Sequence, residues 1–458
     1  MKQNMQDLTE GSLGKKILIF SVPLMLSNLL QVLFNMADIA VIGQFAGSLS
    51  LGAVGSTATL VTMFTGFLIG LSGGINVLTA LYYGAKDKDS LSKTIHSAAL
   101  VSLIMGVLLL VLGVGLSEWM LTALKTKEEL LDKAVLYLRI YYLGMPALAI
   151  YNFGNAVYSA VGNTKKPLYY LGFSGVLNII LNLFFVIVCH MDVAGVALAS
   201  IISQYVSAVL ILQALLRSKD IYALHPGKLR MDRELTRDIL KLGMPSGLQN
   251  VIFQFANSFV QMGVNSFDAT MVAGNSAATN ADAMVYDVMA AFYTACGSFM
   301  GQNYGAGKPE RIWLGIKASV LMMIIYAAFT FVLLMSGAKY FALIFVDPSE
   351  TEILLDTELF LHISCMFFPV LGLLCVLRYT IQGVGFTNLA MFSGVAEMIA
   401  RILVSLYAVP AFGFLAVCYG DPLAWIAADL FLVPAFIYVY KRLKKQVLTN
   451  ASVTQAVA

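Results

Sequence analysis

Long stretches without a charged side chain are the feature of this sequence that most limits its fold. Several stretches of at least 21 residues contain no Lys, Arg, Asp or Glu, among them 97–117, 168–189, 193–216, 242–267 and 318–338. About 20 apolar residues in a helix cross the ~30 Å hydrocarbon core of a bilayer. Because that core offers no water to the backbone, such stretches must form helices, which pair their own N–H and C=O groups. We therefore expect an all-α integral membrane protein.

The composition excludes most other classes of protein. Of the 458 residues, 59% are hydrophobic and 12% are charged, whereas an ordinary soluble domain is about 25% charged. The net charge of +3 is too small to suggest nucleic acid as a partner. The five cysteines lack C-x-x-C spacing, the four histidines lack H-E-x-x-H spacing, and no Walker A sequence occurs. We expect neither an enzyme nor a metal or cofactor site.

The hydropathy pattern predicts twelve membrane-spanning helices. The apolar windows are long and lack the period-two alternation that is typical of strands. Four prolines fall inside the expected spans and can bend them: Pro23, Pro146, Pro245 and Pro369. The expected spans are residues 15–42, 52–83, 93–117, 134–160, 166–189, 193–217, 238–266, 271–303, 312–337, 353–383, 388–408 and 414–440.

The basic residues predict the orientation of these spans, because cytoplasmic loops carry most of the Lys and Arg. With a cytoplasmic N-terminus, 22 of the 29 basic residues fall on the cytoplasmic side and four on the outer side. Arg139, Arg378 and Arg401 fall within or beside spans. No small-x-small cleavage site follows the first apolar run, so we expect an uncleaved first span. Both termini should be cytoplasmic, in the plasma membrane of a bacterium.

An internal repeat divides the chain into two halves. Six markers recur at offsets between 219 and 223: Pro23 and Pro245, Asn28 and Asn250, Gly84-Ala85 and Gly305-Ala306, Pro146 and Pro369, Gly162-x-Thr164 and Gly385-x-Thr387, and Phe173-Ser-Gly-Val176 and Phe392-Ser-Gly-Val395. The repeat predicts a cytoplasmic N-terminal segment (1–14), an N-lobe (15–217), a cytoplasmic linker (218–237), a C-lobe (238–442) and a cytoplasmic tail (443–458).

The even number of spans in each repeat predicts how the lobes are related. Six spans return the chain to the side on which it began, so the two repeats are parallel and related by a pseudo-two-fold axis along the membrane normal. Two such six-helix bundles are expected to enclose a central cleft, which rocking of one lobe would expose to each side in turn. This organisation favours a transporter, although repeats also occur in channels.

Several motifs resemble those of the multidrug and toxin extrusion (MATE) family. They extend over about residues 10–440: Asn35-x-x-Asp38 before Gly43, Tyr83-Gly-Ala85, Gly162-x-Thr164, Asn178-x-x-x-Asn182, Gly195-Val-Ala-Leu-Ala-Ser200 and Gln302-Asn-Tyr-Gly-Ala-Gly307. The resemblance implies a V-shaped pair of six-helix lobes that exports small compounds, often cationic and aromatic. It also implies that inward movement of protons or sodium ions drives the export.

Asp38 is the first candidate for the coupling site. It is the only acidic residue between Glu10 and Asp87 and lies well inside the first span. An ionisable side chain in a membrane costs at least ~2.5 kcal/mol and normally faces a cavity or a partner. Such a carboxylate can bind a proton, or bind sodium together with neighbouring oxygen atoms. The alternative is that the first span ends early and Asp38 lies at the outer interface. The resemblance supports the first reading, since the matching aspartate binds the coupling ion.

Polar side chains in other N-lobe spans complete this candidate site. Asn178 and Asn182 are four residues apart and share a helix face, a pattern that equally fits hydrogen bonding between helices. The resemblance places both, with Ser200, in a network around Asp38. Many relatives carry aspartate at the position of Asn182, so its amide makes sodium binding less expected than proton binding. The resemblance also assigns Asn35 and Asn155 to the substrate cavity, although a structural role fits Asn155 as well.

The C-lobe contains its own charged side chains. Glu397 precedes Arg401 by four residues, a spacing suited to an ion pair within one helix, and Arg378 lies in the preceding span. The set is either a structural ion-pair network or part of coupling or substrate passage. Asp282, Asp287 and Asp429 are weaker acidic candidates. Val260 stands at the repeat position of Asp38, so we expect the ion site in the N-lobe.

These features predict a cation-coupled antiporter that exports drug-like compounds and functions as a monomer in the bilayer. The principal alternative is a flippase of lipid-linked oligosaccharides in the same superfamily, which would need a more strongly cationic cavity. A membrane enzyme or a channel is a third possibility. Gly66-x-x-x-Gly70-x-x-x-Gly74 is expected to serve close helix packing alone.

Overall fold

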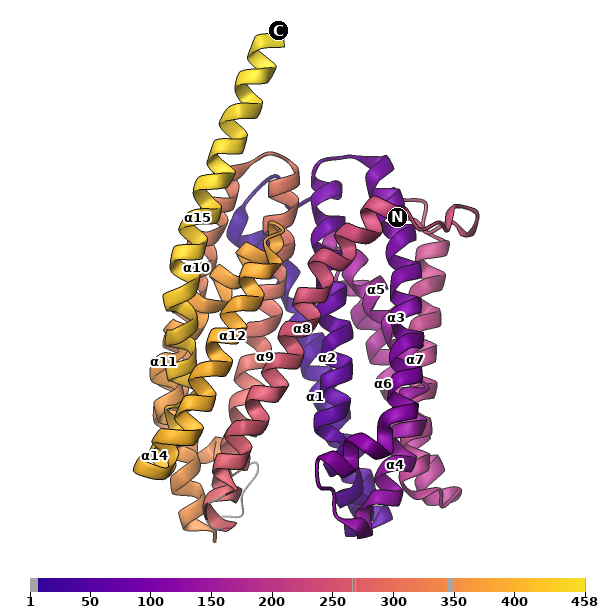
Figure 1. Cartoon of the computed structure of the whole chain (residues 1–458), viewed down its shortest axis with the longest axis vertical. Coiled ribbons are helices and arrows are strands. Elements are labelled where there is room, and N and C mark those ends of the chain that lie inside the picture. The colour runs from indigo at the N-terminus through magenta and orange to yellow at the C-terminus, as the bar shows by residue number, and fades with distance from the viewer. Residues whose placement is uncertain (1–6, 266, 268, 344–348, 458) are drawn as a thin grey trace. The chain divides into compact units, whose positions relative to one another are not determined.

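The chain is helical wherever its structure is described. The computed structural model describes residues 7–265, 267, 269–343 and 349–457, and no strand occurs among them. Figure 1 labels the longer helices. The elements of the first half are, in order, α1 (Leu13–Val41), η1 (Ile42–Ala46), α2 (Ser48–Gly84), α3 (Lys88–Ala123), α4 (Glu128–Tyr142), α5 (Met145–Ala160), α6 (Lys165–Leu183), η2 (Phe184–Val188) and α7 (Asp192–Leu216).

The second half repeats this order of long helices after a polar linker. Its elements are the short η3 (Pro226–Lys228), α8 (Arg233–Val264), α9 (Ala269–Gly305), α10 (Pro309–Ala342), α11 (Thr351–Gly383), α12 (Thr387–Leu403), η4 (Val404–Ala408), α13 (Val409–Phe412), α14 (Phe414–Cys418) and α15 (Gly420–Val457).

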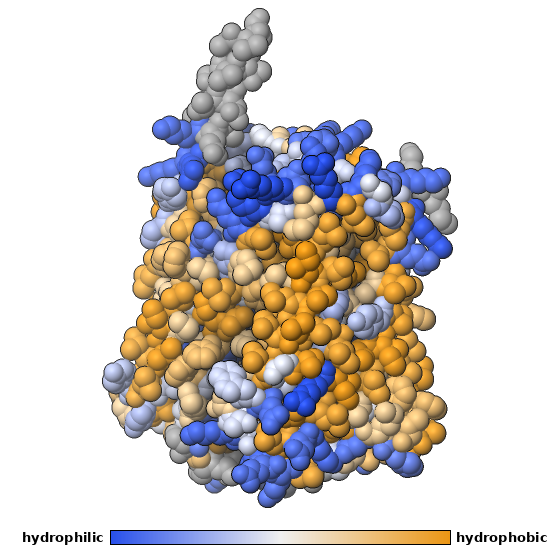
Figure 2. Space-filling model, turned by 45° about the vertical axis from the view of Figure 1, so that its right-hand side comes forward, coloured by the Kyte–Doolittle hydropathy of each residue, from blue (hydrophilic) through white to orange (hydrophobic). Residues whose placement is uncertain are grey.

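The prediction of twelve membrane-spanning helices is confirmed. Within the described residues, nine helices are long and apolar enough to cross a bilayer, and α4 with α5 forms a tenth span. The remaining two spans are α8, with 32 residues, and α9, with 37 residues. On the face drawn in Figure 2, hydrophobic residues cover the middle of the helices and hydrophilic residues gather toward their ends. This distribution suits a surface that contacts lipid.

The fourth span differs from the continuous helix that we expected at 134–160. It begins earlier, at Glu128, and is broken between Tyr142 and Met145 by a bend of 47°. Pro146 lies in the first turn of α5, where its missing N–H costs no intrahelical hydrogen bond. The proline thus explains why the span restarts there. By contrast, Pro23, Pro245 and Pro369 lie inside continuous helices.

The described chain forms two compact units, each with its own core. Unit 1 comprises Asp7 and residues 22–251, and unit 2 comprises residues 8–21 and the chain from Ile252 onward. The core of unit 1 includes the fully buried side chains of Ile95, Phe153 and Ile211. A cluster in unit 2 includes Phe360 and Cys418. The division falls inside two helices, because α1 and α8 each begin in one unit and continue in the other.

Three five-residue π-helical segments follow polar side chains that the sequence marked as candidates. η1 begins four residues after Asp38, η2 begins two residues after Asn182, and η4 begins three residues after Arg401. η2 and η4 begin 220 residues apart, at equivalent positions of the repeat. A π-helical turn is rare and often occurs at a functional site. We expected regular helix at η2 and η4, because hydropathy does not distinguish a π turn from an α turn, whereas η1 lies at and beyond the end of the expected span 15–42.

The glycine motif of α2 packs against the first part of α8, as expected. Asn250 donates a hydrogen bond from Nδ2 to the carbonyl oxygen of Gly66 (2.7 Å). A methyl group built on Gly70 would lie 2.3 Å from the carbonyl oxygen of Ser246, and one on Gly74 would lie 2.4 Å from the backbone nitrogen of Gly243. The two backbones therefore approach too closely for any side chain at these positions.

Replacing Gly70 by valine should destabilise unit 1 by about 1–3 kcal/mol, because the added atoms would force α2 away from α8. The measurement is the midpoint of thermal unfolding of the purified protein in detergent. Gly55→Val is the matched control, since Gly55 lies on the same helix and has nothing within 4 Å of a built methyl group. Equal midpoints for the two variants would contradict this account of the packing.

Candidate functional site

Asp38 lies near the end of α1, at the side of unit 1 where helix α6 approaches. Its side chain is half-buried, and its Oδ1 accepts a hydrogen bond from Nδ2 of Asn182. Among the described residues the structure contains no ion pair to Asp38. The carboxylate is thus held by an amide and carries no compensating positive charge from a Lys, Arg or His side chain.

A chain of hydrogen bonds leads from Asp38 across three helices. Asn182 also donates from Nδ2 to Oδ1 of Asn178 (3.3 Å), one helical turn earlier on α6. Asn178 in turn donates from Nδ2 to Oγ of Ser200 on α7 (3.5 Å). Asn182 is fully buried and Asn178 nearly so. The four residues that the sequence marked for ion coupling therefore lie together in unit 1.

One acceptor among these four hydrogen-bonded side chains has no donor. Oδ1 of Asn182 is buried and has no hydrogen-bond partner among the described residues. A buried polar atom without a partner costs free energy comparable to a lost hydrogen bond. Oδ1 of Asn182 is thus the acceptor of this hydrogen-bonded chain that remains able to take a further donor.

Two tyrosines that the sequence analysis did not identify lie near Asp38. Tyr137 and Tyr141 on α4 stack with ring centroids 5.9 Å apart, and both lie within electrostatic range of Asp38. Tyr137 also belongs to an apolar cluster with Ile42 of η1 and Val186 of η2. Their spacing of four residues places them on one face of the helix, and this was the only sequence feature that could have identified them. Such pairs are common where helices pack, so the spacing alone did not single them out.

The two residues assigned to a substrate cavity lie elsewhere. Asn35 is exposed on α1, one turn before Asp38, and Asn155 is half-buried on α5. The described structure records no hydrogen bond from either residue to the Asp38 chain. Their assignment to a substrate cavity stays a prediction.

In unit 2, Arg378 and Glu397 form a buried ion pair between α11 and α12. The two side chains are only 7% and 4% exposed. Nε of Arg378 also donates to Oγ of Ser393 (2.9 Å), and the guanidinium lies over the ring of Phe253, 5.3 Å from its centroid. This pairing connects three helices, because Phe253 belongs to α8.

Arg401 has a different partner from the one we expected. Its Nη2 lies 2.9 Å from Oδ1 of Asp421 on α15, and its Nη1 donates to Oδ1 of Asn257 on α8 (2.6 Å). The pair within α12 that the spacing suggested is replaced by pairs between helices. The spacing of residues along one helix predicts only contacts within that helix. The partner of Glu397 is Arg378, which lies on the neighbouring helix α11.

Two further carboxylates lie near these ion pairs. Oδ1 of Asp282 and Oδ1 of Asp429 are buried without a hydrogen-bond partner in the part of the chain that is described. Asp282 lies within electrostatic range of Arg401 and Asp421, and Asp429 within range of Arg378 and Glu397. The side chain of Asp287 lies outside the described residues. No group of three or more His, Cys, Asp and Glu side chains suited to a metal occurs in the described structure.

Comparisons with known proteins agree with the repeat and with the fold. The MatE family model matches residues 23–184 and again residues 245–407. The probable multidrug resistance protein YpnP of Bacillus subtilis is 31% identical over 380 residues, which cover 83% of this chain and 84% of that protein. The probable multidrug resistance protein YoeA of the same organism is 25% identical over 460 residues, covering 96% and 97%. A solved structure described as MATE in complex with MaL6 superimposes with a TM-score of 0.88 at 22% identity, covering 96% of this chain and 98% of that chain.

Removing one member of the buried ion pair should destabilise unit 2 strongly. Arg378→Met leaves Glu397 without its partner, and an uncompensated buried charge typically costs about 3–5 kcal/mol. The double variant Arg378→Met/Glu397→Met removes both charges and should recover most of that loss. Thermal unfolding in detergent measures both effects.

The exposed pair of Lys93 and Asp89 (2.6 Å) provides the control. Lys93→Met should change stability by less than about 1 kcal/mol, because exposed ion pairs contribute little. If the single and double variants at Arg378 unfold at the same temperature, the pairing is not what stabilises this part of unit 2.

Proposed function

Because this chain belongs to the MatE family, we propose that it is an antiporter that exports small cationic or amphipathic compounds in exchange for protons. The family consists of multi-pass membrane transporters, and two curated relatives are named as probable multidrug resistance proteins of Bacillus subtilis. We place the protein in the plasma membrane as a monomer, with both termini in the cytoplasm. The lobes are residues 15–217 and 238–442, joined by the linker 218–237.

The observation that carries the proposal is the environment of Asp38. An ionised carboxylate in a membrane helix is costly unless a positive charge or several donors compensate it. Here the described structure supplies one amide donor, from Asn182. A bound proton removes the uncompensated charge, so Asp38 is suited to take up and release a proton during each transport cycle.

The amide at position 182 favours a proton over sodium. A hard cation is held by several oxygen ligands, of which carboxylates supply the negative charge. At this site Asp38 supplies the only carboxylate of the hydrogen-bonded chain, while Asn178, Asn182 and Ser200 contribute neutral groups. A proton needs one carboxylate only. Sodium coupling is therefore the second candidate.

Proton exchange at Asp38 would change the hydrogen bonding of its neighbours. An ionised carboxylate only accepts, whereas a protonated one also donates. The unused Oδ1 of Asn182 is suited to accept from protonated Asp38 after the amide turns. That change would pass to Asn178 and Ser200, and thus from α1 to α6 and α7. Coupling follows if substrate and proton bind the two access states with different affinities.

Side chains near the same site support the proposed cationic substrate. Tyr137 and Tyr141 lie within electrostatic range of Asp38, and aromatic rings attract cations over their faces. In unit 2, Arg378 and Arg401 are engaged by Glu397 and Asp421, which leaves no excess of positive charge for a lipid pyrophosphate. The flippase alternative is disfavoured for this reason.

Asp38→Asn should lower proton-driven export in inverted membrane vesicles by about tenfold or more, as expected for loss of a coupling free energy of 1–3 kcal/mol. The amide keeps the shape and the hydrogen bonding of the side chain but cannot exchange a proton. Export of a fluorescent cationic dye is the measurement. Asp89→Asn, at an exposed acid paired with Lys93, is the control and should export normally.

The coupling ion is identified by collapsing one gradient at a time across proteoliposomes. A protonophore should abolish export in sodium-free buffer, and an imposed sodium gradient without a proton gradient should not restore it. Export that follows the sodium gradient would favour the second candidate. Undiminished export by Asp38→Asn would contradict the assignment of the ion site under either ion.

A further inference from the structure

A short segment before α1 is fastened to unit 2. We call residues Leu8–Gly11 the N-terminal strap. The backbone N–H of Leu8 donates to Oε1 of Gln302 (3.1 Å), and Nδ2 of Asn303 donates to the carbonyl oxygen of Leu8 (3.3 Å). Both side chains belong to the Gln302-Asn-Tyr-Gly-Ala-Gly307 motif and are fully buried. The fastening therefore uses a motif whose role the sequence left open.

Two basic side chains complete the fastening. Nζ of Lys308 donates to the carbonyl oxygen of Thr9 (3.0 Å). Arg311 donates from Nη2 to the carbonyl oxygens of Leu8 and Gly11 (both 3.3 Å), while its Nε donates to Oδ1 of Asn303 (3.2 Å). Lys308 directly precedes α10, and Arg311 lies in its first turn. Together they bind the carbonyl groups of Leu8, Thr9 and Gly11.

The strap is recognised through its backbone and its shape. The side chain of Leu8 is fully buried and that of Thr9 nearly so. Gly11 has φ +75°, a conformation that residues with a Cβ rarely adopt. Gly11 thus ends the strap with a turn that leads into α1 at Leu13. The hydrogen bonds that hold the strap come from side chains at the end of α9 and at the start of α10.

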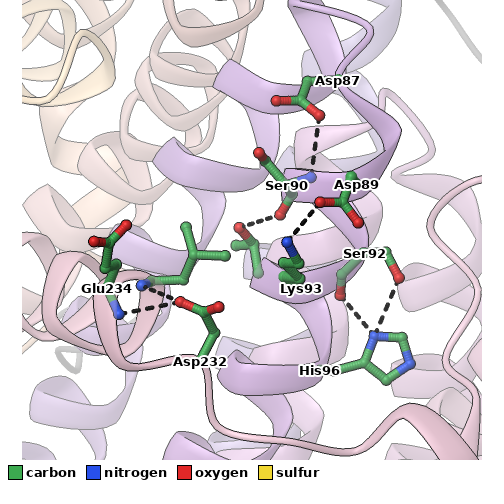
Figure 3. A network of polar contacts seen from close by, with 10 residues as sticks. Asp87, Asp89, Ser90, Ser92, Lys93, His96, Asp232 and Glu234 are labelled. Carbon is green, nitrogen blue, oxygen red and sulfur yellow. Dashed lines mark hydrogen bonds and ion pairs between the residues drawn. The ribbon is translucent and has the colours of Figure 1, made fainter.

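Unit 1 holds the corresponding segment before α8. The backbone N–H of Asp232 donates to Oγ of Ser97 (3.0 Å), which itself donates to the carbonyl oxygen of Arg230 (3.3 Å). The N–H of His225 donates to Nε2 of His96 (3.0 Å). Figure 3 shows His96 on α3 and the side chain of Asp232, which caps the first turn of α8 at Glu234. Each of the two leading segments is therefore bound beside the helices of a single unit.

The strap and Asp38 lie at opposite ends of helix α1: the strap ends two residues before Leu13, and Asp38 lies three residues before Val41. Helix α1 begins in unit 2, with residues 13–21, and continues in unit 1 from Val22. The strap fixes its start to unit 2, and Asp38 is bonded to Asn182 in unit 1. Movement of one unit relative to the other must therefore release one of these attachments or bend α1 near Pro23, which lies beside the division.

We propose that the N-terminal strap is a releasable latch, which holds the start of α1 on unit 2 in the state described here and detaches when the transporter opens at the end that carries the N-terminus. Gln302, Asn303, Lys308 and Arg311 are its positioning residues. The proposal rests on alternating access as part of the proposed function, but it does not depend on which ion is coupled.

The test is a reversible cross-link between the strap and α10. Thr9→Cys and Lys308→Cys are combined with Cys189→Ser, which removes the exposed native thiol, whereas the other four cysteines are buried. A short bis-methanethiosulfonate reagent then bridges the two cysteines over about the length of the replaced lysine side chain. Substrate counterflow in proteoliposomes is measured before the reagent, after it, and after reduction.

Cross-linking should abolish counterflow and reduction should restore it, while binding of a fluorescent substrate to the detergent-solubilised protein remains. The single variant Thr9→Cys in the Cys189→Ser background, treated in the same way, should keep the counterflow that it has before the reagent. Full counterflow by the cross-linked protein would overturn the latch, since bending of α1 would then suffice. Because counterflow needs no ion gradient, this result is independent of the outcome for Asp38→Asn.

A second measurement needs only Thr9→Cys in the Cys189→Ser background. Thr9 is buried in the fastened strap, so a membrane-permeant maleimide should label this cysteine slowly at rest. Labelling should accelerate when substrate is added and the protein cycles between states. A labelling rate that substrate does not change would also overturn the proposal.

Discussion

Every backbone N–H and C=O group in the bilayer must find its partner within the protein, and the rest of this structure depends on that constraint. Because of this constraint each long apolar stretch forms a helix. Interruptions of a helix occur only where the backbone groups that they free are otherwise satisfied. The break between α4 and α5 coincides with a proline that needs no hydrogen bond at that position. The three π-helical segments keep their backbone paired over a wider turn. Charged side chains follow the same rule, since Arg378 and Arg401 both find carboxylates.

The two units differ in how they compensate the cost of placing a carboxylate in a membrane helix. Unit 1 surrounds one carboxylate, Asp38, with neutral amides and a hydroxyl. Unit 2 pairs two of its carboxylates, Glu397 and Asp421, with arginines, while Asp282 and Asp429 have no such ion pair among the described residues. An opposite charge stabilises the ionised form of a carboxylate. A carboxylate among neutral groups lacks that stabilisation and is therefore better suited to bind a proton. The repeat thus preserved the helices while the polar chemistry of the halves diverged.

Much of the fold and part of the candidate site could be predicted from the sequence. Uncharged stretches and repeat offsets determine the twelve spans, because the bilayer leaves an apolar segment few choices. The alignment of Asn178 with Asn182 follows from helical spacing, but their meeting with Asp38 and Ser200 came from the family resemblance. The partner of Arg401 and the fastening of Leu8 to Gln302 and Asn303 depend on contacts between distant segments. No periodic pattern along one segment contains that information.

The wide turns at η2 and η4 alter the phase of the helices that contain them. Each α-helical residue advances the direction of its side chain by about 100°, and a π-helical turn takes up an extra residue. A helical wheel drawn for α6 and extended through Val188 therefore assigns the wrong faces beyond Leu183. The side chain of Val186 is 4% exposed and that of Val188 is 64% exposed. Substitutions meant for the lipid-facing or the inward-facing side of the helix beyond η2 or η4 therefore have to be chosen with this rotation taken into account.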